Sequence, residues 1–116
     1  MTDRAEVIVP AITFVASAAA ARYCNAEPVF ADVVGERDFG IDPTDVEALI
    51  TSRTKAVCVV HYGGYPAAAE VLRELCDARG IAVIEDAAHA PLAHARPGGP
   101  ALGTIGLAGC FSFFSN

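Results

Sequence analysis

Short apolar runs alternate with amphipathic or alanine-rich stretches along most of the chain. The apolar runs are rich in β-branched residues and are bounded by turn residues, which is typical of strands buried on both faces. The stretches between them begin at capping residues or proline, which is typical of helices. The pattern predicts strands at 7–9, 28–33, 56–61, 81–85 and 108–114, and helices at 13–24, 42–51 and 66–79.

The order of these elements is β-α-β-α-β-α-β, followed by a loop with a turn at 97–99 and a last strand. Alternation of this kind predicts an α/β fold, a mainly parallel sheet with helices on both faces. A length of 116 residues is one domain's worth at most. A core strand at the end of the chain would have no helix to cover it, so we expect the natural domain to continue.

The composition narrows the possible partners. Hydrophobic residues make up 53% of the chain and charged residues 19%, below the roughly 25% usual in soluble domains. We therefore expect neighbouring chain or a partner subunit to cover part of the surface. The net charge is −6, and no basic run or stripe is present, so nucleic-acid binding is excluded.

The cysteines and the first apolar run indicate in which cellular compartment the protein is expected. Cys24, Cys58, Cys76 and Cys110 form no C-x-x-C pair, and we expect reduced core thiols in a cytoplasmic protein, without a disulfide or a zinc site. The run at 7–21 is too short and too interrupted to span a bilayer or to serve as a signal peptide, so no membrane association is expected.

Candidate chemistry follows the strands, because ligands of a parallel sheet bind at the carboxyl ends of its strands. The segments placed there are 10–14, 61–66, 85–89 and 112–116. Asp86 follows a dry strand, where a carboxylate stays ionised only with a partner such as a protonated heterocyclic nitrogen. The alternatives are an acid that caps the next turn and a magnesium ligand of a P-loop protein. No P-loop motif is present, which excludes the latter.

Three residues extend this candidate site. Ala88 is small enough to let a flat ligand approach the backbone, and His89 follows it, either as a ligand contact or as a turn histidine. Ser112 lies among three phenylalanines, either as a phosphate donor or as a satisfied serine of a buried strand. His61 and His94 are weaker candidates, and the 89/94 spacing does not match a helical zinc pair. No metal site is expected.

Taken together, these segments resemble the DegT/DnrJ/StrS family of pyridoxal-phosphate (PLP) dependent sugar aminotransferases. The resemblance covers nearly the whole chain, in order and at the family's spacing. The segments are 6–14 (EVIVPAITF), 28–32 (PVFAD), 51–66 (TSRTKAVCVVHYGGYP), 84–90 (IEDAAHA) and 109–116 (GCFSFFSN). The family has the aspartate aminotransferase fold (fold type I). Its members transfer an amino group, usually from glutamate, to a nucleotide-linked keto-sugar.

The resemblance implies a role for each candidate. Asp86 resembles the aspartate that pairs with the pyridine nitrogen of PLP and keeps it protonated. Phe14 resembles the aromatic residue stacked on one face of the ring, and Ala88 would pack on the other face. His89 takes the place of the residue near the phenolic oxygen, and Ser112 resembles the phosphate-binding serine.

The catalytic lysine of the family falls outside this sequence. The family places its Schiff-base lysine directly after the position of Asn116, and the one lysine present, Lys55, precedes a strand at the opposite end. Residues 1–116 are therefore expected to be part of the PLP-binding large domain, without the N-terminal helical part and the C-terminal domain. We expect this chain alone to have no transaminase activity.

Two alternatives remain open from the sequence. One is the dehydratase branch of the same family, in which a histidine replaces the lysine. The other is a non-catalytic remnant that keeps the fold. For the full-length parent the resemblance implies a homodimer with active sites at the subunit interface, and a role in polysaccharide or antibiotic sugar synthesis.

Overall fold

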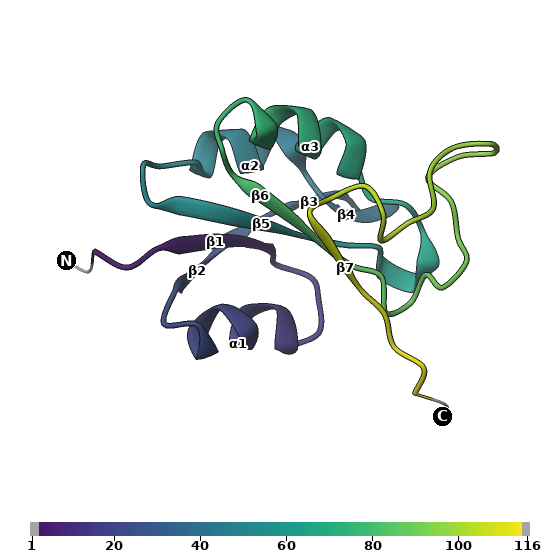
Figure 1. Cartoon of the computed structure of the whole chain (residues 1–116), viewed down its shortest axis with the longest axis horizontal. Coiled ribbons are helices and arrows are strands. Elements are labelled where there is room, and N and C mark those ends of the chain that lie inside the picture. Colours follow the sequence, from purple (N-terminus) through teal and green to yellow (C-terminus); the bar gives the residue numbers. More distant parts are fainter. Residues whose placement is uncertain (1–2, 115–116) are drawn as a thin grey trace.

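The computed structural model describes residues 3–114, and five parallel strands form its main sheet in the order β2-β1-β5-β6-β7 (Figure 1). Each strand is apolar where it enters the core, since buried backbone must be paired in the ladder while its side chains avoid water. The strands are β1 (Glu6–Pro10), β2 (Glu27–Ala31), β5 (Thr54–Val60), β6 (Ala82–Asp86) and β7 (Ala108–Cys110).

Helices cover both faces of this sheet, which confirms the predicted α/β architecture. Figure 1 shows α2 (Pro43–Leu49) and α3 (Ala69–Asp77) on one face and α1 (Ala16–Tyr23) on the other. The face under α2 and α3 holds the dry core, in which the side chains of Val57, Leu72 and Val83 are almost completely buried. At about 25 cal/mol per Å² of apolar surface, this burial is the main force that holds the layers together.

A two-stranded antiparallel hairpin, β3 (Val33–Gly35) with β4 (Asp38–Ile41), was not predicted. The sequence between its strands is short and charged, and the apolar alternation is too brief to identify either strand. The hairpin ends at Ile41, and the backbone N–H of the next residue, Asp42, donates to the carbonyl oxygen of Asp32 over 2.9 Å. This contact returns the chain to the end of β2 before α2 begins.

The predicted helix starts were right for one helix and wrong for two. Asp42 caps α2 by accepting from the backbone N–H of Thr44, with Pro43 in the first turn, as predicted. Helix α1 begins at Ala16, because the hydroxyl of Thr13 bonds to that of Ser17 over 2.9 Å and caps no backbone N–H. Helix α3 begins at Ala69, because the N–H of Ala67 donates to the His61 ring.

The last strand is shorter than the predicted 108–114. Pairing with β6 ends where Cys110 faces Asp86, and β6 has no further residues to extend the ladder. Ser112 and its aromatic neighbours therefore follow the strand as exposed extended chain. Ser115 and Asn116 lie outside the described residues.

The cysteines are free, as predicted, but they are not all core residues. Cys76 is buried and Cys58 is half-buried, whereas Cys24 and Cys110 are exposed. Cys24 follows the last residue of α1, and Cys110 lies on the edge strand β7, so each has an open side. None of the helices found between residues 3 and 114 has the length and apolarity needed to cross a membrane.

Candidate functional site

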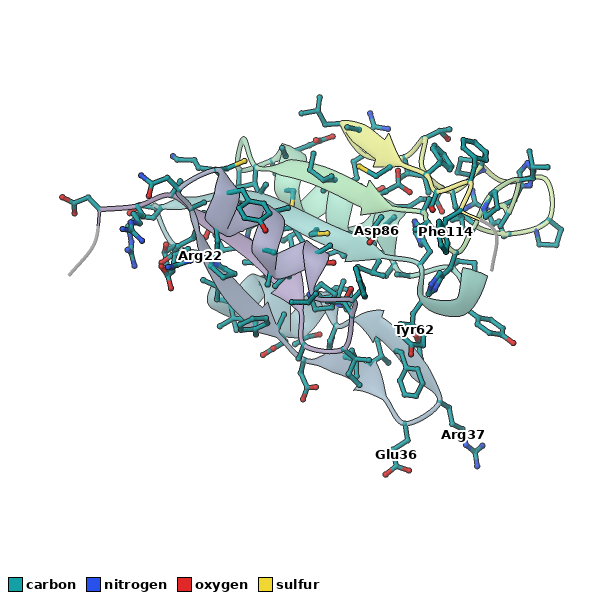
Figure 2. The ribbon with its side chains drawn as sticks, turned by 90° about the horizontal axis from the view of Figure 1, so that it is seen from below. Arg22, Glu36, Arg37, Tyr62, Asp86 and Phe114 are labelled. Atoms are coloured by element: carbon teal, nitrogen blue, oxygen red, sulfur yellow. The ribbon has the colours of Figure 1, made fainter. Side chains whose placement is uncertain are left out.

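The candidate residues gather where β1, β5 and β6 end. Register pairs Val60 of β5 with Asp86 of β6, so the turns that follow these strands start side by side. Figure 2 labels Asp86 and Tyr62 at this end of the sheet. A pocket of about 130 Å³ lies here and is lined by Thr13, Phe14, Val60, His61, Tyr62, Asp86, Ala88 and His89. Four of the five predicted site residues thus share one pocket.

Asp86 is held by its own turn. Its Oδ1 accepts from the backbone N–H of Ala88 over 3.0 Å, so the turn-capping interpretation of this acid is correct. Within residues 3–114, that N–H is the one donor recorded for the carboxylate. The carboxylate keeps acceptor capacity toward the pocket, because each of its oxygens has two lone pairs.

His89 is oriented by the loop after β5. The backbone N–H of Gly63 donates to its Nδ1 over 3.0 Å, and the ring of Tyr62 lies edge-on at a centroid distance of 5.9 Å. Because Nδ1 accepts a hydrogen bond, the neutral imidazole carries its proton on Nε2. His89 is thus prepared to donate one hydrogen bond from Nε2. Gly63 adopts φ +64°, a conformation that favours glycine and lets its N–H point at the histidine.

Phe14 contributes an exposed aromatic ring to the pocket, and Ala88 contributes a small side chain. The side chain of Phe14 is 75% exposed, although it lines the pocket, so it has apolar surface left to cover a flat ligand. Ala88 lines the pocket with a single methyl group and is half-buried. The two residues come from different strand ends, after β1 and after β6.

Ser112 is not among the residues that line this pocket. It follows Cys110, which pairs with Asp86, and its Oγ accepts from the backbone N–H of Phe114 over 3.3 Å. Both residues are exposed. The structure therefore rules out the interpretation of Ser112 as a satisfied serine of a buried strand, and places it near the same end of the sheet.

A buried pair beside the pocket escaped sequence analysis. His61 Nε2 lies 2.9 Å from Glu85 Oε1, and both side chains are fully buried. The signal was present, since a charged residue in a dry strand requires partners, but Asp86 alone was singled out. His61 also lines the pocket, so the pair connects the site with the core.

Glu85 accepts from three backbone N–H groups as well. Oε1 accepts from Gly103, and Oε2 accepts from Ile105 and Gly106, all within 2.9 Å. Burial raises the pKa of Glu85, but the hydrogen bonds from Gly106, His61, Gly103 and Ile105 outweigh it, so the pKa lies below its ordinary value. The carboxylate is thus ionised and serves as an anchor for the 103–106 turn.

Cys58 lies close to the site, and its thiol is unreactive. Burial and, to a smaller extent, the nearby carboxylate of Asp86 together raise the pKa of its thiol to about 12. A thiol that stays protonated is a poor nucleophile, so Cys58 contributes no covalent chemistry at neutral pH.

The donor set fits PLP better than a metal ion. A carboxylate, a histidine with a free Nε2–H, an exposed aromatic ring and a small side chain share one pocket, and these suit a flat, basic heterocycle. Within the described residues, no group of three or more His, Cys, Asp or Glu side chains could hold a metal ion. Thr13 and Ser17 hydroxyls lie beside this pocket and bond to each other.

Comparison with known proteins identifies the family of this chain. The DegT/DnrJ/EryC1/StrS aminotransferase family matches residues 1–116. UDP-N-acetyl-3-dehydro-alpha-D-glucosamine 3-aminotransferase of Acidithiobacillus ferrooxidans is 45% identical over 109 residues, which cover 94% of this chain and 29% of that protein.

Solved structures share the fold at similar coverage. Helicobacter pylori PseC, an aminotransferase involved in the biosynthesis of pseudoaminic acid, has a TM-score of 0.86 at 33% identity over 98% of this chain and 30% of its own. Streptococcus pneumoniae Spr1654 in its PLP form has a TM-score of 0.82 at 28% identity, over 95% of this chain and 31% of its own. This chain thus spans less than a third of the length of these relatives. The chain belongs to the DegT/DnrJ/EryC1/StrS aminotransferase family.

Proposed function

We propose that this chain forms the PLP-binding part of an aminotransferase that transfers an amino group, usually from glutamate, to a nucleotide-linked keto-sugar. The observation that carries the proposal is the pocket shared by Asp86, Ala88, His89 and Phe14 at the strand ends. The aminotransferase relative from Acidithiobacillus ferrooxidans, whose name describes a UDP-linked dehydro-sugar, supports the substrate class. The PLP form of the Streptococcus pneumoniae protein supports the cofactor.

When bound, PLP supplies the electron sink that amino-group transfer requires. Asp86 would hold a proton on the pyridine nitrogen, since its carboxylate has acceptor capacity left beside the bond from Ala88. His89 would donate from Nε2 to the phenolic oxygen, because its Nδ1 already accepts from Gly63.

The remaining three residues would set the position of the ring and of its phosphate. Phe14 would stack on one face, Ala88 would leave room on the other, and the hydroxyl of Ser112 would donate to the phosphate. The Ser112 Oγ accepts from Phe114 in the structure, and a hydroxyl that accepts one bond can still donate another. Subunit pairing is also part of this proposal, since an exposed aromatic side chain such as that of Phe113 suits a covered surface.

Activity should be measured on the protein produced from its native gene, loaded with PLP. Glutamate and UDP-, GDP- or TDP-linked keto-sugars are supplied, and 2-oxoglutarate and the amino-sugar are measured. The proposal predicts equal amounts of both products and their loss in Asp86→Asn. Loss of water from the sugar without 2-oxoglutarate would instead indicate a dehydratase, and the absence of both reactions would contradict catalysis by this protein.

A further inference from the structure

Glu85 does not line the pocket, but it precedes Asp86 and contacts His61, which both line it. Successive side chains of a strand point to opposite faces, so Glu85 faces the core while Asp86 faces the site. Through Oε1, Glu85 contacts the ring of His61, which lines the pocket. Through Oε2, it contacts the backbone of the 103–106 turn.

The tautomer of His61 shows that Oε1 of Glu85 acts as a hydrogen-bond acceptor. The backbone N–H of Ala67 donates to His61 Nδ1 over 3.1 Å, so Nδ1 carries no proton and Nε2 does. His61 therefore donates to Glu85 Oε1, and the same oxygen accepts from Gly103. Both donors are fixed, and an acceptor at the position of Oε1 is required.

Oε2 determines where the last strand begins. It accepts from the N–H of Ile105 over 2.7 Å and from that of Gly106 over 2.8 Å. Directly after Gly106, the N–H of Leu107 donates to the carbonyl oxygen of Val83 over 2.7 Å, and β7 starts. A side chain at Gly106 would overlap with the backbone of Val83, so this approach is tight.

Strand β7 leads to Ser112, two residues beyond the last paired residue, Cys110. The strand has only three residues and lies at the sheet edge, so its own ladder is a weak constraint. An anchor at its start is then needed to fix its register and the position of the residues that follow.

We infer that Glu85 is a positioning residue for the phosphate side of the cofactor site, which it fixes by holding the 103–106 turn and thereby the segment that carries Ser112. This inference rests on the proposed function, because it takes Ser112 as the phosphate donor. No role in the chemistry itself is assigned to Glu85, which is buried and does not line the pocket.

Glu85→Gln weakens the anchor. Each carboxylate oxygen accepts from two N–H donors, and the glutamine amide has one carbonyl oxygen, so its NH₂ group must face one of the two pairs of donors and the bonds to that pair are lost. Each pair includes a backbone N–H of the 103–106 turn, namely that of Gly103 or those of Ile105 and Gly106. The damage therefore falls on the turn that leads to Ser112.

The test compares two probes that need no lysine, pyridoxamine 5′-phosphate and pyridoxamine, on the purified chain by calorimetric titration. Glu85→Gln should weaken binding of the phosphorylated probe about fivefold, and Ser112→Ala about tenfold. The double variant should bind no more than about twofold more weakly than Ser112→Ala, since both act on one contact. Pyridoxamine affinity should stay within about twofold throughout, as should both affinities in the exposed control Glu74→Gln.

Several outcomes would overturn the inference. If Glu85→Gln weakens both probes equally, or if its effect adds fully to that of Ser112→Ala, Glu85 has only a structural role. If the wild-type chain binds neither probe, the proposed cofactor site fails and the inference fails with it. If wild type binds but Ser112→Ala has no effect, the assignment of Ser112 is wrong.

A second measurement on the wild-type chain needs no folded variant. Hydrogen exchange at the amides of Ile105 and Gly106 should slow at least about threefold when pyridoxamine 5′-phosphate binds, and should not slow with pyridoxamine. If the exchange rate at these amides does not change when the phosphorylated probe binds, the 103–106 turn is not linked to the phosphate and the inference is wrong.

Discussion

His61 and Glu85 share a hydrogen bond of 2.9 Å between Nε2 and Oε1, and neither side chain is exposed to solvent. The imidazole is neutral, because its Nδ1 accepts from Ala67. The carboxylate is therefore stabilised by N–H dipoles rather than by a full positive charge. Such a group is sensitive to protonation, since a proton on the carboxylate displaces a donor.

This arrangement predicts a stability loss in acid. The pKa of Glu85 is lowered from an ordinary value of 4.5 in the folded chain. Ionised Glu85 therefore stabilises the fold at pH values above 4.5, and this contribution is lost as the pH falls through the lowered pKa. Urea unfolding from neutral to acid pH should show this loss in wild type.

Glu85→Gln provides the comparison, since it removes the titrating group. At neutral pH we expect it to lower the free energy of unfolding by about 1–3 kcal/mol, because buried donors lose their acceptor. Its difference from wild type should shrink as the pH falls below 4.5, where Glu85 of the unfolded chain gains a proton, and should be lost once the pH passes the lowered pKa of the folded chain. A difference that stays constant at every pH would contradict the ionised state of Glu85.

The close approach of two glycines predicts a second stability effect. A side chain at Gly109 would overlap with the carbonyl oxygen of Gly103, which is backbone and cannot move aside. Gly109→Ala should therefore cost about 3 kcal/mol of the free energy of unfolding. Gly35→Ala is the matched control, because no atom lies within 4 Å of its added methyl group, and its effect should be close to zero. Equal unfolding midpoints in urea for both variants would contradict the packing of β7.

The four thiols should differ in reactivity. Burial, together with the carboxylate of Asp86, raises the pKa of Cys58 to about 12, and burial also raises the pKa of Cys76. With a disulfide reagent under native conditions at mildly alkaline pH, Cys24 and Cys110 should react first, because they are exposed. Mass mapping of the modified peptides identifies the order. Fast modification of Cys58 would contradict its protonated, half-buried state.

The single lysine of the sequence predicts an inactive chain. Lys55 is exposed near the amino end of β5, whereas the pocket lies beyond its carboxyl end. It cannot bond to a cofactor held by Asp86. The 116-residue chain with PLP, glutamate and a nucleotide-linked keto-sugar should form 2-oxoglutarate no faster than the reagents without protein. Sustained turnover would show that another group replaces the lysine.

The sequence predicted the elements whose patterns are long. The runs at β1, β5 and β6 are continuous and β-branched, and Asp42 with Pro43 marks a helix start directly. The β3–β4 hairpin could not be predicted, because its strands are short and its pairing is decided by the chain around it. The aromatic residues after Cys110 look like a strand, but pairing ends with the last residue of β6.

The site was predicted in part for a similar reason. Residues that follow strands can be located by pattern alone, so Asp86, Ala88 and His89 could be grouped before the structure was known. The hydrogen-bond partners of these residues could not be predicted, because the bonds of His61 and Glu85 join segments far apart in the sequence. A charged residue in an apolar strand indicates that Glu85 needs partners, but its three backbone partners could not be identified, because they carry no side-chain signal.

The pairing of Asp86 with a pyridine nitrogen is the central claim, and the ¹⁵N NMR shift of ring-labelled pyridoxamine 5′-phosphate bound to the purified chain tests it most directly. The chain should bind this probe with the ring nitrogen protonated at a pH where the free probe has lost that proton. Asp86→Asn should abolish this protonation, although the side-chain oxygen of the asparagine can still accept from the backbone N–H of Ala88. A ring nitrogen with the same shift in wild type and in Asp86→Asn would contradict the account.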